Sequence, residues 1–429
     1  MKKKMLSLLI AALFTVSNGG FAAPTPTDGE YGVVIEGYDW GPAVSKVILS
    51  LAEPVSSVDW NDYKVMVQRS SECSTIPAHQ VLGSRSVVAG YVSDTEGVSL
   101  EEGNHITLVL AVAPNLPLGS PIQYSRGQGC SGNNWIDYDM TITDEAKGLV
   151  WNTEVNRIMP IIDRFDLSGK FSDGEGITMS YASFTPEDDQ EEAPLIIWLH
   201  GGGEGGVDPS IPLVANRAAN YASDEIQAIF GGAYVLVPQT PTRWMDSGEG
   251  STSGQVDDIY FGAVKALIEE FISAHPKVDR DRIYVGGCSN GGYLTLKLLI
   301  EYPDFFAAAF PSALAYRNSN LTDAQVERIK DIPIWFVHSK DDGTTQPDET
   351  VVPVYKRLKE AGAPNVHFTF YDHVVDITGF FGGEGYHYPG HWSWIYAHAN
   401  EARRDYDGSL VELDGRPVAI MEWMAGQSR

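Results

Sequence analysis

Hydrophobic and polar residues follow two different patterns along the chain. From about residue 31 to residue 142 the apolar runs are short, and Gly, Pro, Asn and Ser separate them. Within residues 63–67 and 106–112, apolar residues recur at every second position, which is typical of strands that bury one face. Short alternating runs between turn residues predict an antiparallel β-sandwich.

After residue 165 the pattern changes to apolar runs that alternate with helical segments. Two alternating sets, at residues 165–169 and 177–181, predict opening strands. Apolar side chains at residues 256–273 recur at helical spacing. Continuous apolar runs predict buried strands at residues 195–199, 233–237, 283–285, 305–310, 334–337 and 366–370. Strands that alternate with helices predict a mostly parallel sheet with helices on both faces.

Residues 144–157, between the two patterns, have few strand signals and are interpreted as the join. We therefore expect an all-β, immunoglobulin-like sandwich at residues 23–145 and an α/β domain at residues 146–429. The first domain contains no collected catalytic residues, so any chemistry is expected in the second. Active sites of parallel sheets lie beyond the carboxyl ends of the strands.

The N-terminus has the order of a secretory signal peptide, predicted at residues 1–22. Three lysines follow Met1, residues 5–16 are almost entirely apolar, and small residues come next. Cleavage after Ala22 leaves Gly20 and Ala22 at the positions that the peptidase reads. We expect a secreted or periplasmic protein without membrane insertion, because no later apolar run approaches the roughly 20 residues that span a bilayer.

The charge of the chain bears on its partners. Removing residues 1–22, which contain three lysines and no acidic residue, takes the formal net charge from −27 to −30. Such a charge repels nucleic acid and anionic membrane surfaces, so neither is an expected partner. The sandwich could bind a polymer, shape the rim of the site or mediate assembly into a homo-oligomer, and the sequence leaves these roles open.

Three cysteines are present. In an oxidising compartment Cys73 and Cys130 could close a disulfide within the first domain. Cys288 would then be unpaired, and we interpret it as a small buried side chain rather than a reactive thiol.

A Gly-x-Ser-x-Gly pentapeptide at residues 287–291 lies between a predicted strand and a predicted helix. Glycines on both sides of Ser289 permit a tight turn, and the helix directs its amide dipoles at developing negative charge. Ser289 is therefore the candidate nucleophile, although the pentapeptide alone would equally fit a turn with a capping serine. The glycine-rich residues 200–206 directly follow an early strand. The backbone amides of Gly202 or Gly203, together with that of Asn290, are the candidate oxyanion donors.

A serine nucleophile also needs a base and an orienting carboxylate. Asp341 and Asp342 follow the strand that ends at His338. Asp342 is preferred, because many hydrolases of this fold place the aspartate four residues beyond that histidine, and Asp341 is the fallback. His391 is the candidate base, since it follows the last strand and precedes a helix. A zinc site at His387 and His391 is disfavoured because Pro389 lies between them, and no metal is expected.

Residues from about 165 to 398 resemble the secreted α/β-hydrolase group that contains polyhydroxybutyrate-depolymerase-like and feruloyl-esterase-like enzymes and predicted peptidases. The matching segments are residues 200–206, 238–246, 279–287, 287–291 and 391–394. With the immunoglobulin-like domain in front, the chain resembles esterases of the bacterial EstA type. The resemblance implies a carboxylic-ester hydrolase with Ser289, Asp342 and His391 as its triad. Ser339 departs from the pattern, which usually has glycine at this position.

The expected reaction is two-step acyl transfer through an acyl-enzyme, which requires no cofactor. Expected substrates are short- to medium-chain, aryl or polymer-derived esters, because the short segment at residues 312–331 leaves no room for a large lid. Trp244 is expected to line the substrate pocket or, equally, to pin its loop to the domain. The alternatives are a serine peptidase of the same fold and a non-catalytic adhesion protein. The intact order of Ser289, Asp342 and His391 argues against the second alternative.

Overall fold

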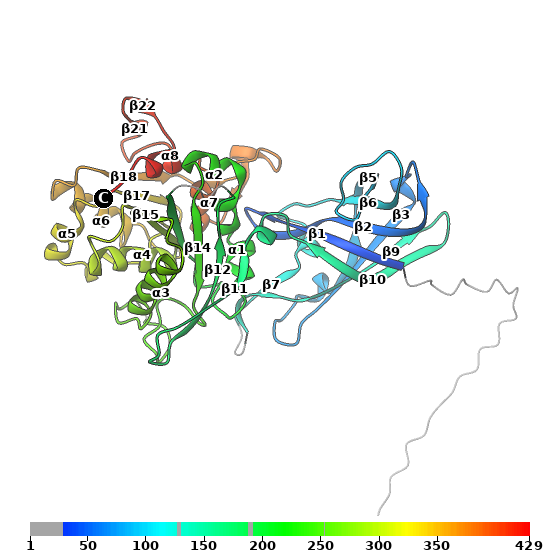
Figure 1. The fold of residues 1–429 in the computed structure, drawn as a ribbon, viewed down its shortest axis with the longest axis horizontal. Helices are drawn as coiled ribbons and strands as arrows, with labels where there is room; N and C mark the ends of the chain where they lie inside the picture. The colour runs from blue at the N-terminus through cyan, green and yellow to red at the C-terminus, as the bar shows by residue number, and fades with distance from the viewer. Residues whose placement is uncertain (1–28, 127–129, 188–191, 253) are drawn as a thin grey trace, which may run out of the picture.

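The computed structural model describes residues 29–126, 130–187, 192–252 and 254–429. An all-β domain and an α/β domain follow one another along the long axis of the molecule (Figure 1). The predicted signal peptide at residues 1–22 lies outside the described residues.

The first domain is all-β, and most of its strands belong to one sheet whose two ends approach each other. Its strands are β1 (Gly29–Tyr38), β2 (Gly41–Val55), β3 (Tyr63–Ser70), β4 (Leu82–Arg85), β5 (Val87–Ser93), β6 (Gly103–Leu110), β7 (Ile122–Arg126), β8 (Ser131–Trp135), β9 (Asp137–Asp144) and β10 (Leu149–Ile158). The main ladder has the order β4-β3-β9-β10-β1-β2-β6-β5, and β7 pairs with β8 in a separate hairpin. Gly90 of β5 lies against Trp60 just before β3, so the two ends of the ladder approach each other. Buried and exposed residues alternate strictly along β3, as predicted.

Strand β10 corrects the sequence prediction at two points. The predicted join at residues 144–157 is wrong, because residues 149–158 pair with β9 and with β1. The β1–β10 pair is parallel, an exception to the predicted antiparallel pairing. Most side chains of β10 are exposed and Trp151 alone is fully buried, which is why its hydrophobic pattern is weak. We infer that the boundary between the domains falls after Ile158 rather than between residues 145 and 146.

Cys73 and Cys130 form a disulfide, which confirms the pairing that the sequence left open. Cys73 lies just after β3, and Cys130 lies just before β8. The bond therefore ties the β7–β8 hairpin to the main ladder of the first domain.

The second domain is built on a sheet with the strand order β11-β12-β14-β13-β15-β16-β17-β18 (Figure 1). The strands are β11 (Asp166–Ser172), β12 (Thr178–Phe184), β13 (Ala193–Leu199), β14 (Tyr234–Gln239), β15 (Val278–Cys288), β16 (Ala308–Ser312), β17 (Ile334–Ser339) and β18 (Val366–Tyr371). β12 runs antiparallel to both of its neighbours, whereas the strands from β14 to β18 run parallel. The predicted mostly parallel sheet is confirmed.

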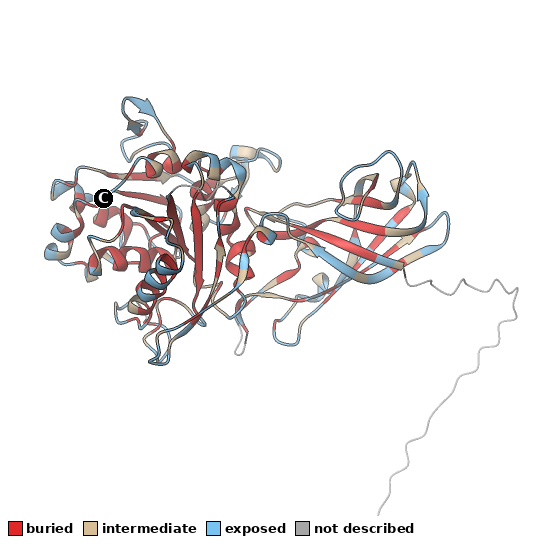
Figure 2. Ribbon diagram, viewed as in Figure 1, coloured by how far each residue is buried: buried red, intermediate tan, exposed pale blue. Residues whose placement is uncertain are grey.

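Side chains of the central strands point alternately to the two faces of this sheet. In β13, Ile196 and Trp198 join one core, and Leu195, Ile197 and Leu199 join the other. The helices are α1 (Ser210–Ala215), α2 (Asp224–Phe230), α3 (Phe261–Ala274), α4 (Asn290–Glu301), α5 (Asp323–Ile329), α6 (Val351–Glu360), α7 (Trp394–His398) and α8 (Ile420–Ala425). Helices α3 to α6 pack on one face, and α1, α2, α7 and α8 pack on the other. The strands are therefore buried between two helical layers (Figure 2).

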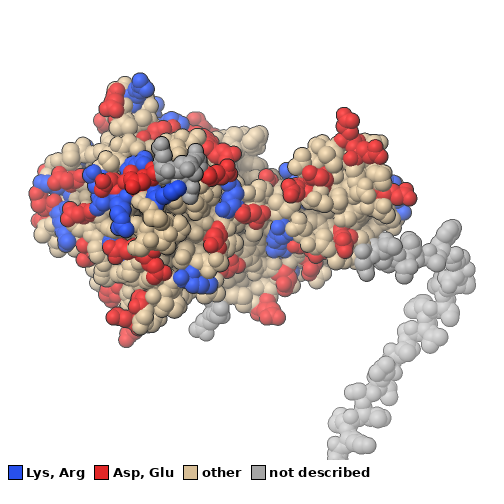
Figure 3. Space-filling view, in the orientation of Figure 1, with Lys and Arg blue, Asp and Glu red and all other residues tan. Residues whose placement is uncertain are grey.

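The surface reflects the acidic composition. Asp and Glu side chains are spread over both domains on the face drawn in Figure 3, with Lys and Arg side chains among them. In the part of the chain that the structure describes, no helix is long and apolar enough to cross a membrane.

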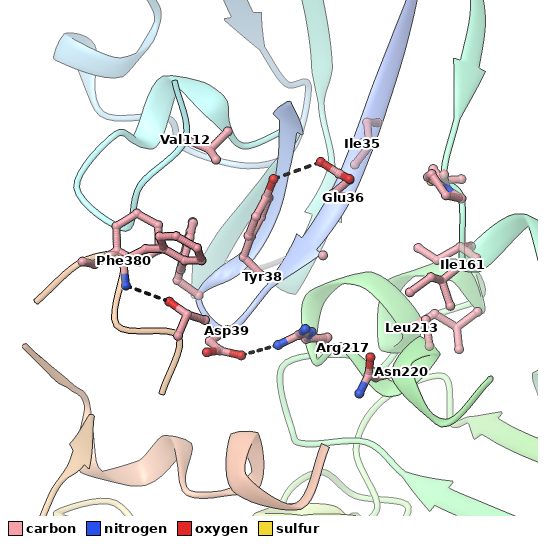
Figure 4. A pocket seen from close by; sticks show the side chains of 18 residues that line it. Ile35, Glu36, Tyr38, Asp39, Val112, Ile161, Leu213, Arg217, Asn220 and Phe380 are labelled. Atoms are coloured by element: carbon pink, nitrogen blue, oxygen red, sulfur yellow. Dashed lines mark hydrogen bonds and ion pairs between the residues drawn. The ribbon is translucent and has the colours of Figure 1, made fainter. Parts of the chain in front are cut away.

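A pocket of about 590 Å³ lies where the two domains meet (Figure 4). The rings of Tyr38 and Trp40, from the first domain, stack at 4.7 Å on its wall. Across the junction, Arg217 Nη1 lies 2.6 Å from Asp39 Oδ1, whose side chain is buried. Ser289, like the other candidate triad residues, does not line this pocket.

Candidate active site

The pentapeptide forms a sharp turn between β15, which ends at Cys288, and α4, which begins at Asn290. Ser289 has φ 54° and ψ −111°, a strained conformation for a residue with a side chain. A Cβ at Gly291 would collide with the carbonyl oxygen of Leu199, and one at Gly287 would lie 2.6 Å from Gly291. Both glycines are therefore required for the turn. Ser289 does not cap α4 with its side chain, which removes the alternative interpretation of a capping serine.

The two candidate aspartates contact different histidines. Asp342 Oδ2 accepts a hydrogen bond of 2.9 Å from His391 Nδ1, and its side chain is completely buried. Asp341 is 35% exposed and lies 2.8 Å from Nδ1 of His373. Asp341 also accepts a hydrogen bond from the hydroxyl of Ser339, the residue that departs from the family pattern. Of the two, Asp342 is the carboxylate in contact with the candidate base.

Asp342 is held by the turn that follows β17. Its Oδ1 accepts hydrogen bonds from the backbone amides of Thr344 and Thr345, at 2.8 and 3.0 Å. The Thr345 hydroxyl donates to Oδ2 at 2.7 Å, and His338 Nε2 lies 3.0 Å from the same oxygen. Burial acts to raise the pKa of Asp342, but hydrogen bonds from His338 and His391 outweigh it and hold the pKa well below its usual range. Asp342 therefore remains ionised.

His391 lies in the short 3₁₀ turn at Gly390–Trp392, after the small hairpin β19 (Val374–Val375) and β20 (His387–Tyr388). A Cβ at Gly390 would collide with Asp341, so glycine lets this segment pass over the turn after β17. The ring of Trp394 meets the imidazole of His391 edge-on at 5.3 Å. With Nδ1 bonded to Asp342, Nε2 is the ring nitrogen left for a reacting hydroxyl.

The glycine-rich loop is fixed at its start by His200. This side chain is fully buried, its Nδ1 donates to the carbonyl of Gly201 at 2.6 Å, and its Nε2 accepts from the amide of Thr240 at 3.3 Å. Burial lowers the pKa of His200 to about 4, so the ring is neutral. Further along the loop, a Cβ on Gly202 would lie 3.7 Å from that of Asn290. The two segments predicted to supply oxyanion donors are therefore neighbours.

Trp244 does not line the pocket at Ser289, so of the two roles considered from the sequence its position fits the second, pinning the loop to the domain, and not contact with substrate. Its side chain is 0% exposed, and its Nε1 donates a hydrogen bond of 3.0 Å to the carbonyl of His200. It also meets the ring of Tyr260 edge-on. The position after strand β14 is visible in the sequence, but the direction of the indole depends on packing. Trp244 supports the glycine-rich loop from behind.

We expect Trp244→Phe to destabilise the protein by about 1 to 3 kcal/mol, since it leaves the buried carbonyl of His200 without its donor. KM for a small ester should change little, because the indole has no surface in the pocket. Thermal unfolding and steady-state kinetics measure the two effects. A large rise in KM without a loss of stability would restore a role in substrate binding.

A pocket of about 420 Å³ opens at Ser289. Asn290, Arg317, Thr345 and Gln346 also line it, so the surface around the serine is largely polar. Thr345 was missed by sequence reasoning, yet its hydroxyl contacts both Asp342 and His391. Its only sequence signal is its position three residues after Asp342.

Two histidines near Asp341, His373 and His387, lie side by side. The rings of His373 and His387 stack at 4.3 Å. Among the described residues, no group of three or more His, Cys, Asp or Glu side chains could hold a metal ion. Cys288 is buried as predicted, and burial raises the pKa of its thiol well above the usual value.

Two segments of the chain match known protein families. Residues 30–154 match the family described as Esterase Ig-like N-terminal domain. Residues 182–376 match the family described as Phospholipase/Carboxylesterase.

Two curated proteins are similar to part of the chain. Poly(3-hydroxyalkanoate) depolymerase C of Paucimonas lemoignei is 28% identical over 131 residues, which are 28% of this chain and 28% of that protein. The candidate esterase NocK of Nocardia uniformis subsp. tsuyamanensis is 30% identical over 117 residues, 27% of this chain and 31% of that protein. The chain thus spans less than a third of the length of either relative.

A crystal structure of a thermostable esterase matches the fold of both domains, with a TM-score of 0.73 and 24% sequence identity. The match covers 93% of this chain and 99% of that chain. The chain therefore combines an immunoglobulin-like domain that matches the Esterase Ig-like N-terminal domain family with an α/β-hydrolase domain that matches the Phospholipase/Carboxylesterase family.

Proposed function

We propose that the protein is a serine carboxylic-ester hydrolase with Ser289, His391 and Asp342 as its catalytic triad. The observation that carries the proposal is the hydrogen bond from His391 to the buried Asp342, at the end of the sheet where Ser289 occupies a strained turn. The match to the phospholipase/carboxylesterase family supports the same reaction.

In the proposed mechanism, Ser289 Oγ attacks the ester carbonyl while Nε2 of His391 takes the hydroxyl proton. Asp342 holds Nδ1 and stabilises the imidazolium. Backbone amides of Gly202 and Asn290 stabilise the tetrahedral oxyanion, with Gly203 as the alternative donor from the loop. The carbon–oxygen ester bond then breaks, and His391 returns the proton to the departing alcohol. Water attacks the acyl-enzyme by the same route and releases the acid.

The pocket favours small or polar esters over long fatty chains. It is lined largely by polar groups, and Arg317 lies exposed at its edge. Between β16 and β17 the chain forms only a 3₁₀ turn and the short helix α5, which supports an uncovered site. Substrates of this kind include the end of a polyester chain, the class named for the depolymerase relative. We also propose that the protein is exported, on the basis of residues 1–22.

The test is turnover of p-nitrophenyl esters of increasing acyl length beside p-nitroanilide peptides. We expect hydrolysis of the acetyl and butyryl esters, with kcat/KM at least about tenfold lower for the palmitoyl ester, because a polar pocket gains little from burying methylenes. Peptide anilides should be hydrolysed far more slowly.

Turnover of the anilides alone would favour the serine peptidase, and no turnover of either class would favour a binding protein. The matched control is Ser289→Ala, which separates hydrolysis by this site from hydrolysis by a contaminant.

A further inference from the structure

The β7–β8 hairpin of the first domain reaches the glycine-rich loop of the second. The backbone amide of Asn133, in β8, donates a hydrogen bond of 2.6 Å to the carbonyl of Gly203. The side-chain amide of Asn133 donates to Glu204 Oε1 at 2.9 Å. One residue of the first domain therefore holds two consecutive residues of the loop that carries the candidate oxyanion donors.

The backbone of the hairpin and the backbone of the glycine-rich loop are in direct contact. Gly132 has φ +87°, and a Cβ there would collide with the carbonyl group of Gly203. Glycine at this position allows the hairpin to approach the loop directly. The disulfide at Cys130 anchors the same hairpin to the body of the first domain. The hairpin is therefore covalently fixed to the first domain close to the point where it contacts the loop.

Glu204 connects this contact, through Asn216, to the turn that contains Ser289. Its Oε2 accepts a hydrogen bond of 3.0 Å from Asn216 Nδ2, and the same amide lies 3.1 Å from Sγ of Cys288, the residue before Ser289. Glu204 is 8% exposed, and burial raises its pKa to about 7 although the hydrogen bond from Asn133 acts to lower it. A buried carboxylate is stable only while its hydrogen-bond partners are present.

We propose that Asn133 is a positioning residue that the first domain supplies to the active site of the second. Through Gly203 and Glu204 it fixes the backbone of Gly202 opposite Asn290, where the oxyanion is to be bound. It touches no substrate and acts on kcat through the geometry of the loop. This inference rests on the proposed function, since it assigns a role within the same site.

An isosteric exchange of the two side chains tests the proposal. Asn133→Asp places two carboxylates in contact, and they repel each other. Glu204→Gln places an amide group next to the amide of Asn133 or of Asn216, so that two hydrogen-bond donors face each other. In the double variant the hydrogen bond is reversed, because the new amide at position 204 can donate to the new carboxylate at position 133 while its oxygen accepts from Asn216. The assay is run at about pH 8.5, above the pKa of about 7 of Glu204, so that this carboxylate is ionised. Each single change should then lower kcat about 10- to 100-fold, because misplaced oxyanion donors stabilise the transition state less. KM should stay within about threefold, and the double variant should recover kcat to within about fivefold of the native chain.

Trp135→Phe is the matched control. It removes another hydrogen bond from the same hairpin, from Trp135 Nε1 to Ser210 Oγ at 2.9 Å, which does not involve the glycine-rich loop. We expect its kcat to stay unchanged even if the melting temperature falls. If either single variant folds poorly, Asn133→Ala provides the same comparison without adding a charge.

Amide hydrogen exchange at residues 201–205 gives a readout that does not depend on turnover. Exchange should accelerate in Asn133→Asp and return to the native rate in the double variant. The proposal is overturned if exchange and kcat are unchanged in the single variants, or if their losses simply multiply in the double variant. If exchange responds as expected but the native chain hydrolyses no ester, the proposed function fails while the loop contact stands.

Discussion

Replacing Ser289 by alanine is expected to lower kcat for a short-chain ester by about 10⁴- to 10⁶-fold, since it removes the hydroxyl that forms the proposed acyl-enzyme. Stability should be nearly unchanged. The hydroxyl caps no helix and fills little space, and the backbone strain at this position is not relieved because alanine also carries a Cβ. Steady-state kinetics and thermal unfolding of the two chains measure both effects.

The control for this prediction is labelling by a serine-directed phosphonate. The native chain should gain the mass of one phosphonyl group, whereas Ser289→Ala should gain none. Labelling of the alanine variant at another serine, together with retained turnover, would move the nucleophile away from the pentapeptide.

Asp342→Asn is expected to lower kcat by about 10⁴-fold, as is usual when an amide replaces the carboxylate of a triad. The physical reason lies in the tautomer of His391. An amide at this position can donate a hydrogen bond to Nδ1, which places the imidazole proton on Nε2 and prevents that nitrogen from acting as the base. The neighbouring hydrogen bonds from Thr344 and Thr345 would also lose their charged acceptor.

The adjacent aspartate provides the matched control. Asp341→Asn should lower kcat by less than about tenfold, because Asp341 is partly exposed and pairs with His373 instead. Comparison of kcat for the two variants decides between the neighbouring carboxylates. A larger loss for Asp341→Asn than for Asp342→Asn would exchange their roles.

Elements were predictable where burial leaves a regular pattern of apolar residues, either at every second position or in a continuous run. The alternation in residues 63–67 identifies β3 because every second side chain is buried there. The continuous apolar run at residues 195–199 identifies β13 because both of its faces are covered. β10 escaped prediction because its side chains are mostly exposed, although its backbone is paired on both sides. Backbone hydrogen bonding does not require a pattern of apolar and polar side chains. A strand of this kind can therefore be recognised only in the folded sheet.

In the candidate site, too, some residues could be identified from local sequence and others only from the tertiary structure. Ser289 could be found from local sequence, because a turn this tight requires glycine two residues before and two residues after it. Asp341 and Asp342 could not be ranked by the residues around them alone, since both follow the same strand. The family pattern favoured Asp342, and the contact with His391 agrees with that choice. Trp244 occupies the expected loop, but packing against Tyr260 turns its side chain inward.

Local pattern was enough to predict two successive domains, the periodicity of the main elements and the chain order of the candidate nucleophile, acid and histidine. Those features depend on neighbours within a few residues, where backbone conformation limits what each residue type can do. Tertiary structure alone decided which histidine meets which aspartate, where Trp244 points, and that Asn133 reaches Glu204 from another domain. Hydrogen bonds form only within about 3.5 Å, and the separation of groups distant in sequence is set by how whole elements pack.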